Sequence, residues 1–143
     1  MKRIYMDGVC DLLHYGHIRA FINAKSKGDF LIVGIHNNET VESYKRRPIM
    51  NMDERIEMVK AIKYVDEVIP NAPIHITEEF IEKHQIDLVV AGDDHTDDQM
   101  NTMYSIPVKL GRFEAIPYTK TVSTTDIINR LHERIHNPND NIF

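Results

Sequence analysis

Hydrophobic residues gather in five short runs along the chain, and most of these runs are nearly continuous rather than alternating with polar residues. A short continuous run rich in β-branched residues is typical of a strand that is buried on both faces of a sheet. The predicted strands cover residues 4–6, 29–35, 64–70, 86–94 and 113–117. A turn is expected after the first strand at Asp7-Gly8, because glycine adopts backbone angles that other residues avoid.

Segments with helical spacing of hydrophobic residues lie between these strands. The first predicted helix begins after His14 and ends before Gly28. Further helices are predicted at residues 39–44, 51–63, 77–84, 105–110 and 123–136. Alternation of strands and helices predicts parallel pairing through right-handed crossovers. We therefore expect an α/β fold in which a five-stranded parallel sheet carries helices on both faces. Residues 95–104 are mostly polar, so we predict that they form a mobile loop over the ligand-binding edge of the sheet.

The length, charge and cysteine content of the chain limit the classes of protein to which it can belong. The 143 residues predict one domain, residues 1–136, followed by a polar C-terminal tail, residues 137–143. A formal net charge of −5 argues against nonspecific nucleic-acid binding, which uses basic surfaces. The single cysteine, Cys10, excludes an internal disulfide and fits a reducing compartment. We find no signal peptide and no membrane segment, so we expect a cytoplasmic protein.

Two histidines, His14 and His17, lie where the first strand passes into the first helix. Residues three apart in sequence can share one side of a helical turn. A helix start also attracts phosphate, because its N–H groups are unpaired and its dipole end is positive. The pair therefore favours phosphate chemistry, with a plain surface pair or half of a metal site as the alternatives.

Two further segments carry candidate chemistry at other strand and helix ends. The basic cluster from Lys45 to Arg47 is either a solvated loop or a source of positive charge for a phosphoryl group in transfer. Asp93 and Asp94 end the fourth strand, where ligands of parallel sheets bind. These carboxylates suit Mg²⁺ or the amine of a base, or form a structural turn.

Three hydroxyl residues, Ser123, Thr124 and Thr125, open the last predicted helix. A hydroxyl at this place caps the helix, and several together can also hold phosphate oxygens. A simple cap, which needs only one of the three, is the alternative.

The motif Asp7-Gly8-x-x-Asp11 followed by His14-x-Gly16-His17 resembles that of the cytidylyltransferases, within the nucleotidyltransferases that carry a His-x-Gly-His motif. The resemblance is strongest to the choline-phosphate and ethanolamine-phosphate enzymes. It covers residues 1 to about 135, and it implies a Rossmann-like nucleotidyltransferase fold.

The last hydroxyl-rich segment is similar to a further signature of this family, Arg-Thr-x-Gly-[Ile/Val]-Ser-Thr-[Ser/Thr]. Thr119 and the residues from Val122 to Thr125 match it. Tyr118 stands where the family has an arginine that binds nucleotide phosphates, and Thr121 stands where it has glycine. Lys120 is expected to replace that arginine in part. These departures leave open a relative that binds nucleotide without turning it over.

The resemblance implies roles for residues in four segments. The implied catalytic residues are His14, His17 and Lys45. The implied nucleotide-binding residues are Asp7, Gly8, Val9, Cys10, Gly92, Asp93, Asp94, Thr119, Lys120, Val122, Ser123, Thr124 and Thr125. The implied substrate-binding residues are Lys45, Asp11 and Tyr104. No residue is expected to ligate a metal directly, and Mg²⁺ is expected to bind through the nucleotide phosphates.

The implied reaction joins CTP and a phosphorylated small alcohol to give a CDP-alcohol and pyrophosphate. Choline enzymes of the family place a tryptophan after an Ala-Pro pair, where this chain has Ile74. A quaternary ammonium needs an aromatic cage, so ethanolamine phosphate is favoured over choline phosphate. Glycerol 3-phosphate, and an adenylyltransferase of the same superfamily, are alternatives. The segment 64–70 resembles part of the family's dimer surface, so we expect a homodimer.

Overall fold

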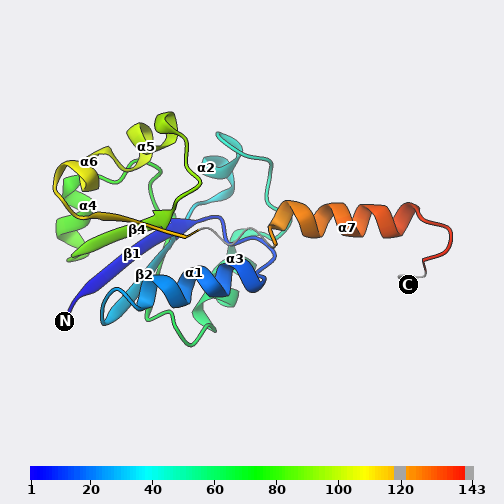
Figure 1. Cartoon of the computed structure of the whole chain (residues 1–143), viewed down its shortest axis with the longest axis horizontal. Helices are drawn as coiled ribbons and strands as arrows, with labels where there is room; N and C mark the ends of the chain where they lie inside the picture. Colours follow the sequence, from blue (N-terminus) through cyan, green and yellow to red (C-terminus); the bar gives the residue numbers. More distant parts are fainter. Residues whose placement is uncertain (118–121, 141–143) are drawn as a thin grey trace.

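The computed structural model describes residues 1–117 and 122–140 of the chain. Within these residues five parallel strands form one sheet, in the order β3-β2-β1-β4-β5 (Figure 1). The strands are β1 (Arg3–Gly8), β2 (Phe30–Ile35), β3 (Glu67–Pro70), β4 (Leu88–Gly92) and β5 (Phe113–Ile116). The predicted five-stranded parallel sheet is confirmed. β1 occupies its centre, paired with β2 along six residues and with β4 on its other edge.

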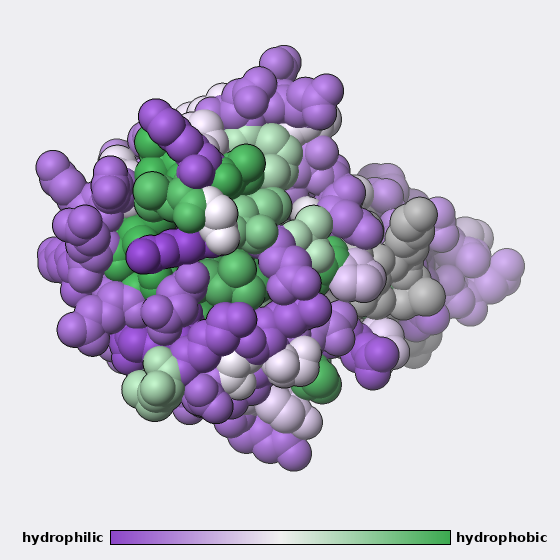
Figure 2. Space-filling view, turned by 60° about the vertical axis from the view of Figure 1, so that its left-hand side comes forward, coloured by the Kyte–Doolittle hydropathy of each residue, from purple (hydrophilic) through white to green (hydrophobic). Residues whose placement is uncertain are grey.

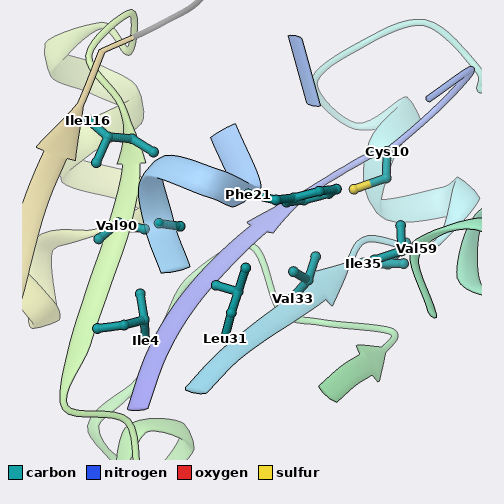
Figure 3. Close-up of a cluster of buried hydrophobic side chains, with 10 residues drawn as sticks. Ile4, Cys10, Phe21, Leu31, Val33, Ile35, Val59, Val90 and Ile116 are labelled. Atoms are coloured by element: carbon teal, nitrogen blue, oxygen red, sulfur yellow. The ribbon is translucent and has the colours of Figure 1, made fainter. Parts of the chain in front are cut away.

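Helices connect the strands and cover both faces of the sheet, as the sequence predicts. They are α1 (Tyr15–Lys25), α2 (Asn38–Glu42), α3 (Met52–Lys60), α4 (Glu78–Lys83), α5 (Asp97–Met103), α6 (Ser105–Lys109) and α7 (Thr124–His136). Side chains of one strand alternate between the two faces. Ile4 of β1 packs with Phe21 of α1 on one face, and Tyr5 packs with Ile81 of α4 on the other. Figure 3 shows the first of these two cores.

Three details of the fold differ from the sequence prediction. The third strand begins only at Glu67, because Asp66 turns its carboxylate onto the Leu31 N–H at 2.8 Å and to the Lys25 ammonium. Residues 97–103 form helix α5 rather than a loop. The turn after β1 is made by Cys10 and Leu12, whose φ angles are +57° and +47°, and not at Gly8.

Helix α5 has a clear local cause. Thr96 accepts a hydrogen bond from the Gln99 N–H at its hydroxyl, and the Gln99 side chain accepts from the Thr96 N–H. This reciprocal capping box satisfies two donors at the helix start. Asp97 and Asp98 add negative charge to the same turn, where the helix dipole is positive.

Helix α7 projects away from the sheet and carries the C-terminal end of the chain far from the core (Figure 1). None of its residues is buried, and Leu131 and Ile135 are about half exposed. Figure 2 shows polar side chains over most of the face it presents, around one hydrophobic patch, with α7 receding behind. No helix in residues 1–117 and 122–140 is long and hydrophobic enough to span a bilayer.

Candidate active site

A cavity of about 740 Å³ opens beyond the carboxyl ends of β1, β4 and β5. Open parallel sheets bind ligands at this edge, at the point where the strand order reverses. In this sheet that point is β1, because the chain continues to β2 on one side of it and later to β4 on the other. Segments far apart in the sequence form its wall. They include residues 6–11, His14, Gly16 and His17, residues 43–46, residues 102–104 and residues 122–125. The segments that the sequence predicts to share a site therefore meet in one cavity.

His14 and His17 cap the start of α1 with their own rings. His14 Nδ1 accepts the Gly16 N–H at 3.0 Å, and His17 Nδ1 accepts the His14 N–H at 3.2 Å. A ring nitrogen that accepts an N–H carries no proton, so each neutral ring carries its proton on Nε2. The two rings lie 4.0 Å apart between centroids. Both histidines therefore keep Nε2–H as the donor that is not committed to the cap.

Both histidines are held in the neutral form. Burial, the neighbouring His14 and the positive charge of Lys45 together lower the pKa of His17 to about 3, against the opposing effect of Asp11. Burial also lowers the pKa of His14, while the negative charge of Asp126 raises it. Protonation of either ring at Nδ1 would break its cap. At neutral pH the pair thus offers two hydrogen-bond donors without a full positive charge.

The start of α7 lies directly beside His14. The His14 Nε2–H donates to Thr124 Oγ1 at 3.3 Å, and the Thr124 hydroxyl donates to the Asp11 carbonyl at 2.9 Å. Ser123 is the N-cap, and its Oγ accepts the Asp126 N–H at 3.0 Å. The N-termini of α1 and α7 therefore converge on one place, and both attract anions.

Asp11, predicted to bind substrate, holds the loop that follows Lys45. Its two carboxylate oxygens accept the N–H groups of Ile49 and Met50 at 2.8 and 2.9 Å. The residue is buried, with 4% of its surface exposed. In this arrangement the carboxylate fixes the position of residues 45–50 relative to β1, and its role toward a substrate stays a prediction.

Lys45 lines the cavity, and its positive charge helps to lower the pKa of His17. The next residue, Arg46, also lines the cavity and donates from Nη1 to Thr125 Oγ1 at 3.2 Å. Arg47 instead points to Glu42, 3.9 Å from its Nε. The basic cluster therefore divides into two cations that face the site and one that faces α2.

A chain of hydrogen bonds, buried at Tyr104, Asp7 and His36, joins the loop of Lys45 to the far wall of the cavity. Tyr104 donates its hydroxyl to Asp7 at 2.7 Å, and the other Asp7 oxygen lies 3.2 Å from His36 Nε2. His36 Nδ1 lies 2.7 Å from the hydroxyl of Tyr44, the residue before Lys45. Burial, followed by the charge of Asp7, raises the pKa of both tyrosines well above the usual range, so their hydroxyls stay protonated and donate.

Arg55 is the residue of this region that the sequence analysis missed. It is fully buried and donates to the carbonyls of Val9 and His36 at 2.7 and 2.8 Å and to the Asn38 side chain at 2.7 Å. Burial lowers its pKa, against the negative charge of Asp11. Its partners come from segments distant in the sequence, so no local pattern predicts this buried role. Two features of the sequence point toward it: the acidic first turn of the helix, and an arginine in a helix that has a hydrophobic face.

The remaining predicted residues fall into three groups. Gly8, Val9, Cys10, Gly92, Asp94 and Val122 all line the cavity, and burial raises the pKa of the Cys10 thiol to about 12. Asp93 lies at the end of β4, where its N–H donates to the Ile116 carbonyl at 3.0 Å. Thr119 and Lys120, with Tyr118 and Thr121, lie outside the described residues. Within the described part of the chain no group of three or more His, Cys, Asp or Glu side chains could hold a metal.

Comparison with known proteins identifies the relatives of this chain. Residues 5–130 match a family model described as cytidylyltransferase-like. Ethanolamine-phosphate cytidylyltransferase of Arabidopsis thaliana is 43% identical over 134 residues, which cover 90% of this chain and 32% of that protein. Choline-phosphate cytidylyltransferase 2 of the same plant is 40% identical over 135 residues, which cover 90% of this chain and 44% of that protein. The chain thus spans about a third of the length of the ethanolamine relative.

A solved structure supports the same assignment of fold. The lipopolysaccharide core biosynthesis protein from Thermoplasma volcanium superposes with a TM-score of 0.71 and 26% sequence identity. The superposition covers 84% of this chain and 99% of that one. The Rossmann-like nucleotidyltransferase fold expected from the sequence is therefore shown.

Proposed function

Because the chain belongs to the cytidylyltransferase-like family, we propose that it transfers CMP from CTP to a phosphorylated small alcohol, giving a CDP-alcohol and pyrophosphate. The observation that carries the proposal is the convergence of His14, His17, Lys45 and the Thr124 helix start on one cavity. All four groups donate hydrogen bonds, and none is a strong base or a nucleophile at neutral pH. Such a set suits phosphate groups that are already ionised.

The chemistry needs no covalent intermediate on the protein. A phosphate oxygen of the alcohol phosphate attacks the α-phosphorus of CTP, and the bond from that phosphorus to the β-phosphate oxygen breaks. The attacking oxygen is already deprotonated, so catalysis consists of positioning and of stabilising negative charge. Nε2–H of His17 would donate to the α-phosphate oxygens and to the oxygen that leaves, and Nε2–H of His14 would join it by exchanging its contact with Thr124 Oγ1 for a phosphate oxygen. Lys45 would hold the two reacting phosphates together.

The start of α7 would hold the β- and γ-phosphates. Its first N–H groups have no acceptor inside the helix, as at any helix start. The hydroxyl of Thr124 ties this helix start to Asp11 and to His14, so the two phosphate-binding turns keep a fixed distance. Mg²⁺ would arrive on the nucleotide, because phosphate oxygens are ligands that it prefers, and it would neutralise charge on the triphosphate.

Ethanolamine phosphate is the alcohol phosphate we favour. Its ammonium has N–H groups that can donate hydrogen bonds to carboxylates. The quaternary ammonium of choline has no N–H group and is bound instead by the faces of aromatic rings. The cavity wall holds Ile74 at the position where the family's choline enzymes have tryptophan, and it also holds the carboxylates of Asp7, Asp94 and Asp98. The relatives support the same order, since the ethanolamine-phosphate enzyme from Arabidopsis thaliana is 43% identical and its choline counterpart is 40% identical.

We also propose that the protein acts in the cytoplasm as a homodimer. The buried, un-ionised thiol of Cys10 suits a reducing compartment. The dimer proposal rests on the family resemblance of residues 64–70, although Asp66 there is engaged with Lys25 and β2 of its own chain. Sedimentation at several protein concentrations tests the dimer: a single species at the monomer mass throughout contradicts it.

Pyrophosphate release tests the function directly. The purified protein would be mixed with Mg²⁺ and either CTP or ATP, together with ethanolamine phosphate, choline phosphate or glycerol 3-phosphate. We expect turnover with CTP and the fastest turnover with ethanolamine phosphate. No release with any pair would contradict the proposal and would favour a nucleotide-binding relative without activity.

A matched pair of variants separates chemistry from folding. His17→Asn keeps an oxygen that can accept the His14 N–H but removes the Nε2–H, so we expect turnover to fall about 100- to 1,000-fold with the fold retained. His132→Asn, on the exposed face of α7, makes the same change away from the cavity and should leave turnover as it is. Equal activity of the two variants would remove His17 from the mechanism.

A further inference from the structure

The loop after α2 and the start of α7 meet at a single hydrogen bond over the cavity. Arg46 Nη1 donates to Thr125 Oγ1 at 3.2 Å. Both residues line the cavity. The contact joins two segments that are 79 residues apart in the sequence. Neither residue is fixed by burial, since both are exposed, so the guanidinium is free to exchange this contact for a ligand.

The hydroxyl groups at the start of α7 are not equally available to a ligand. The Thr124 hydroxyl already donates to the Asp11 carbonyl, whereas Ser123 Oγ accepts the Asp126 N–H and keeps its own proton to donate. Thr125 Oγ1 accepts from Arg46, which leaves its own proton to donate. A guanidinium has five N–H donors, and one of those of Arg46 is used on Thr125. Arg46 and Thr125 together therefore present a cluster of donors at one point.

The phosphate groups of the substrates would bring much negative charge into the cavity. The proposed reaction brings four phosphate groups into the cavity, three on CTP and one on the second substrate. In the described part of the cavity wall, Lys45 and Arg46 are the lysine and arginine side chains. Asp126 adds a negative charge in the first turn of α7. In the described part of the cavity wall, Arg46 is the cation that contacts the start of α7, where the terminal phosphates are expected, whereas Lys45 acts on His17.

We propose that Arg46, which already lies against the start of α7, binds the β- and γ-phosphates of CTP and the pyrophosphate formed from them. The inference rests on the proposed function and adds a residue to the same site. A guanidinium suits the role because its planar fork can donate two parallel hydrogen bonds to phosphate oxygens. Arg46 thereby supplies positive charge beside the start of α7.

The neighbouring arginine provides a matched control. Arg47 has the same charge and lies one residue along the chain, but it points to Glu42 and is not part of the described cavity wall. The variants are Arg46→Gln, Arg46→Lys and Arg47→Gln. Binding of CTP, CMP and pyrophosphate to each would be measured by calorimetry with Mg²⁺ present, and KM and kcat would be measured for both substrates.

CMP is the informative ligand, because it lacks the two phosphates that Arg46 is proposed to hold. We expect Arg46→Gln to weaken binding of CTP and of pyrophosphate about 10- to 100-fold, the usual worth of hydrogen bonds to a charged group. Binding of CMP should change less than about twofold, and KM for the alcohol phosphate should stay near its original value. Arg46→Lys should recover part of the loss, since it keeps the charge without the fork. Arg47→Gln should match the unmodified protein.

The outcomes separate this inference from the proposed function. Equal weakening of CTP and CMP, or equal effects of Arg46→Gln and Arg47→Gln, overturns the role of Arg46 while CTP turnover still supports the function. Arg46-dependent binding of pyrophosphate without turnover of CTP supports the role and overturns the function. An unmodified protein that binds neither CTP nor pyrophosphate overturns both.

Discussion

Replacing His17 with asparagine changes how the stability of the protein depends on pH, and the size of the change follows from the buried ring. The pKa of His17 is lowered from 6.5 to about 3 in the folded chain. The unfolded chain therefore binds a proton in this pH range that the folded chain does not. Stability from this group is fully present above pH 6.5 and is lost as the pH falls toward 3.

The magnitude can be worked out for a practical pair of conditions. Each pH unit in this window lowers the free energy of unfolding by about 1.4 kcal/mol. At pH 5, about 1.5 units below the ordinary pKa of histidine, the loss relative to pH 8 is about 2 kcal/mol from His17. Asparagine does not titrate and keeps an acceptor for the His14 N–H, so His17→Asn should lose about 2 kcal/mol less than the unmodified protein over the same interval.

Urea unfolding at pH 8 and pH 5 measures this difference, with midpoint and slope determined for both proteins. Contributions from other titrating groups cancel in the comparison as long as they are distant from His17. His132→Asn serves as the control, since this residue is exposed on α7. A constant gap in unfolding free energy between the His17 variant and the unmodified protein at both pH values would falsify the assignment of a buried, neutral His17.

Four further substitutions probe the packing around the site and the sheet. Tyr5 has a buried hydroxyl without a partner in the described residues, so Tyr5→Phe should raise the free energy of unfolding by about 1 kcal/mol. Gly34→Ala should lower the free energy of unfolding, measured in urea, by about 2 kcal/mol, because its added Cβ would overlap that hydroxyl. Tyr5→Phe should therefore also reduce the cost of Gly34→Ala when the two are combined. Arg55→Lys should cost about 3 kcal/mol by the same measurement, because an ammonium cannot reach all the acceptors that the guanidinium serves; a loss below 1 kcal/mol contradicts its proposed importance. Gly16→Ala places a Cβ 2.8 Å from His14 Cε1, so turnover should fall at least about tenfold as the ring is displaced, and unchanged kcat refutes this.

The strands and the place of the site were predictable because they depend on local patterns. A strand covered on both faces must be hydrophobic almost throughout, and β2 and β4 are. The histidine pair stood out because it follows such a strand at the start of a helical pattern. In a parallel sheet, that position alone directs both side chains to the edge where ligands bind.

Helix α5 and the role of Arg55 were not predicted, for different physical reasons. Helix α5 is short and polar, so it lacks a hydrophobic period, and its signal is the capping box between Thr96 and Gln99. Arg55 is a charged residue that is buried among partners from two other segments, at Val9 and at His36 to Asn38. No local pattern encodes such a contact. The capping by His14 and His17 also escaped prediction, because the usual caps are Ser, Thr, Asp and Asn.

The central position of β1 has a consequence for how the protein is made. β1 leaves the ribosome first, yet one of its two edges pairs with β4, which begins at Leu88. At a synthesis rate of about 5 to 20 residues per second, that edge waits roughly 4 to 16 seconds for its partner. An unpaired strand edge is prone to join other chains, so this interval is when the nascent chain is most exposed to aggregation. Because α7 follows later still in the chain, its part of the phosphate-binding cavity is synthesised only after β4.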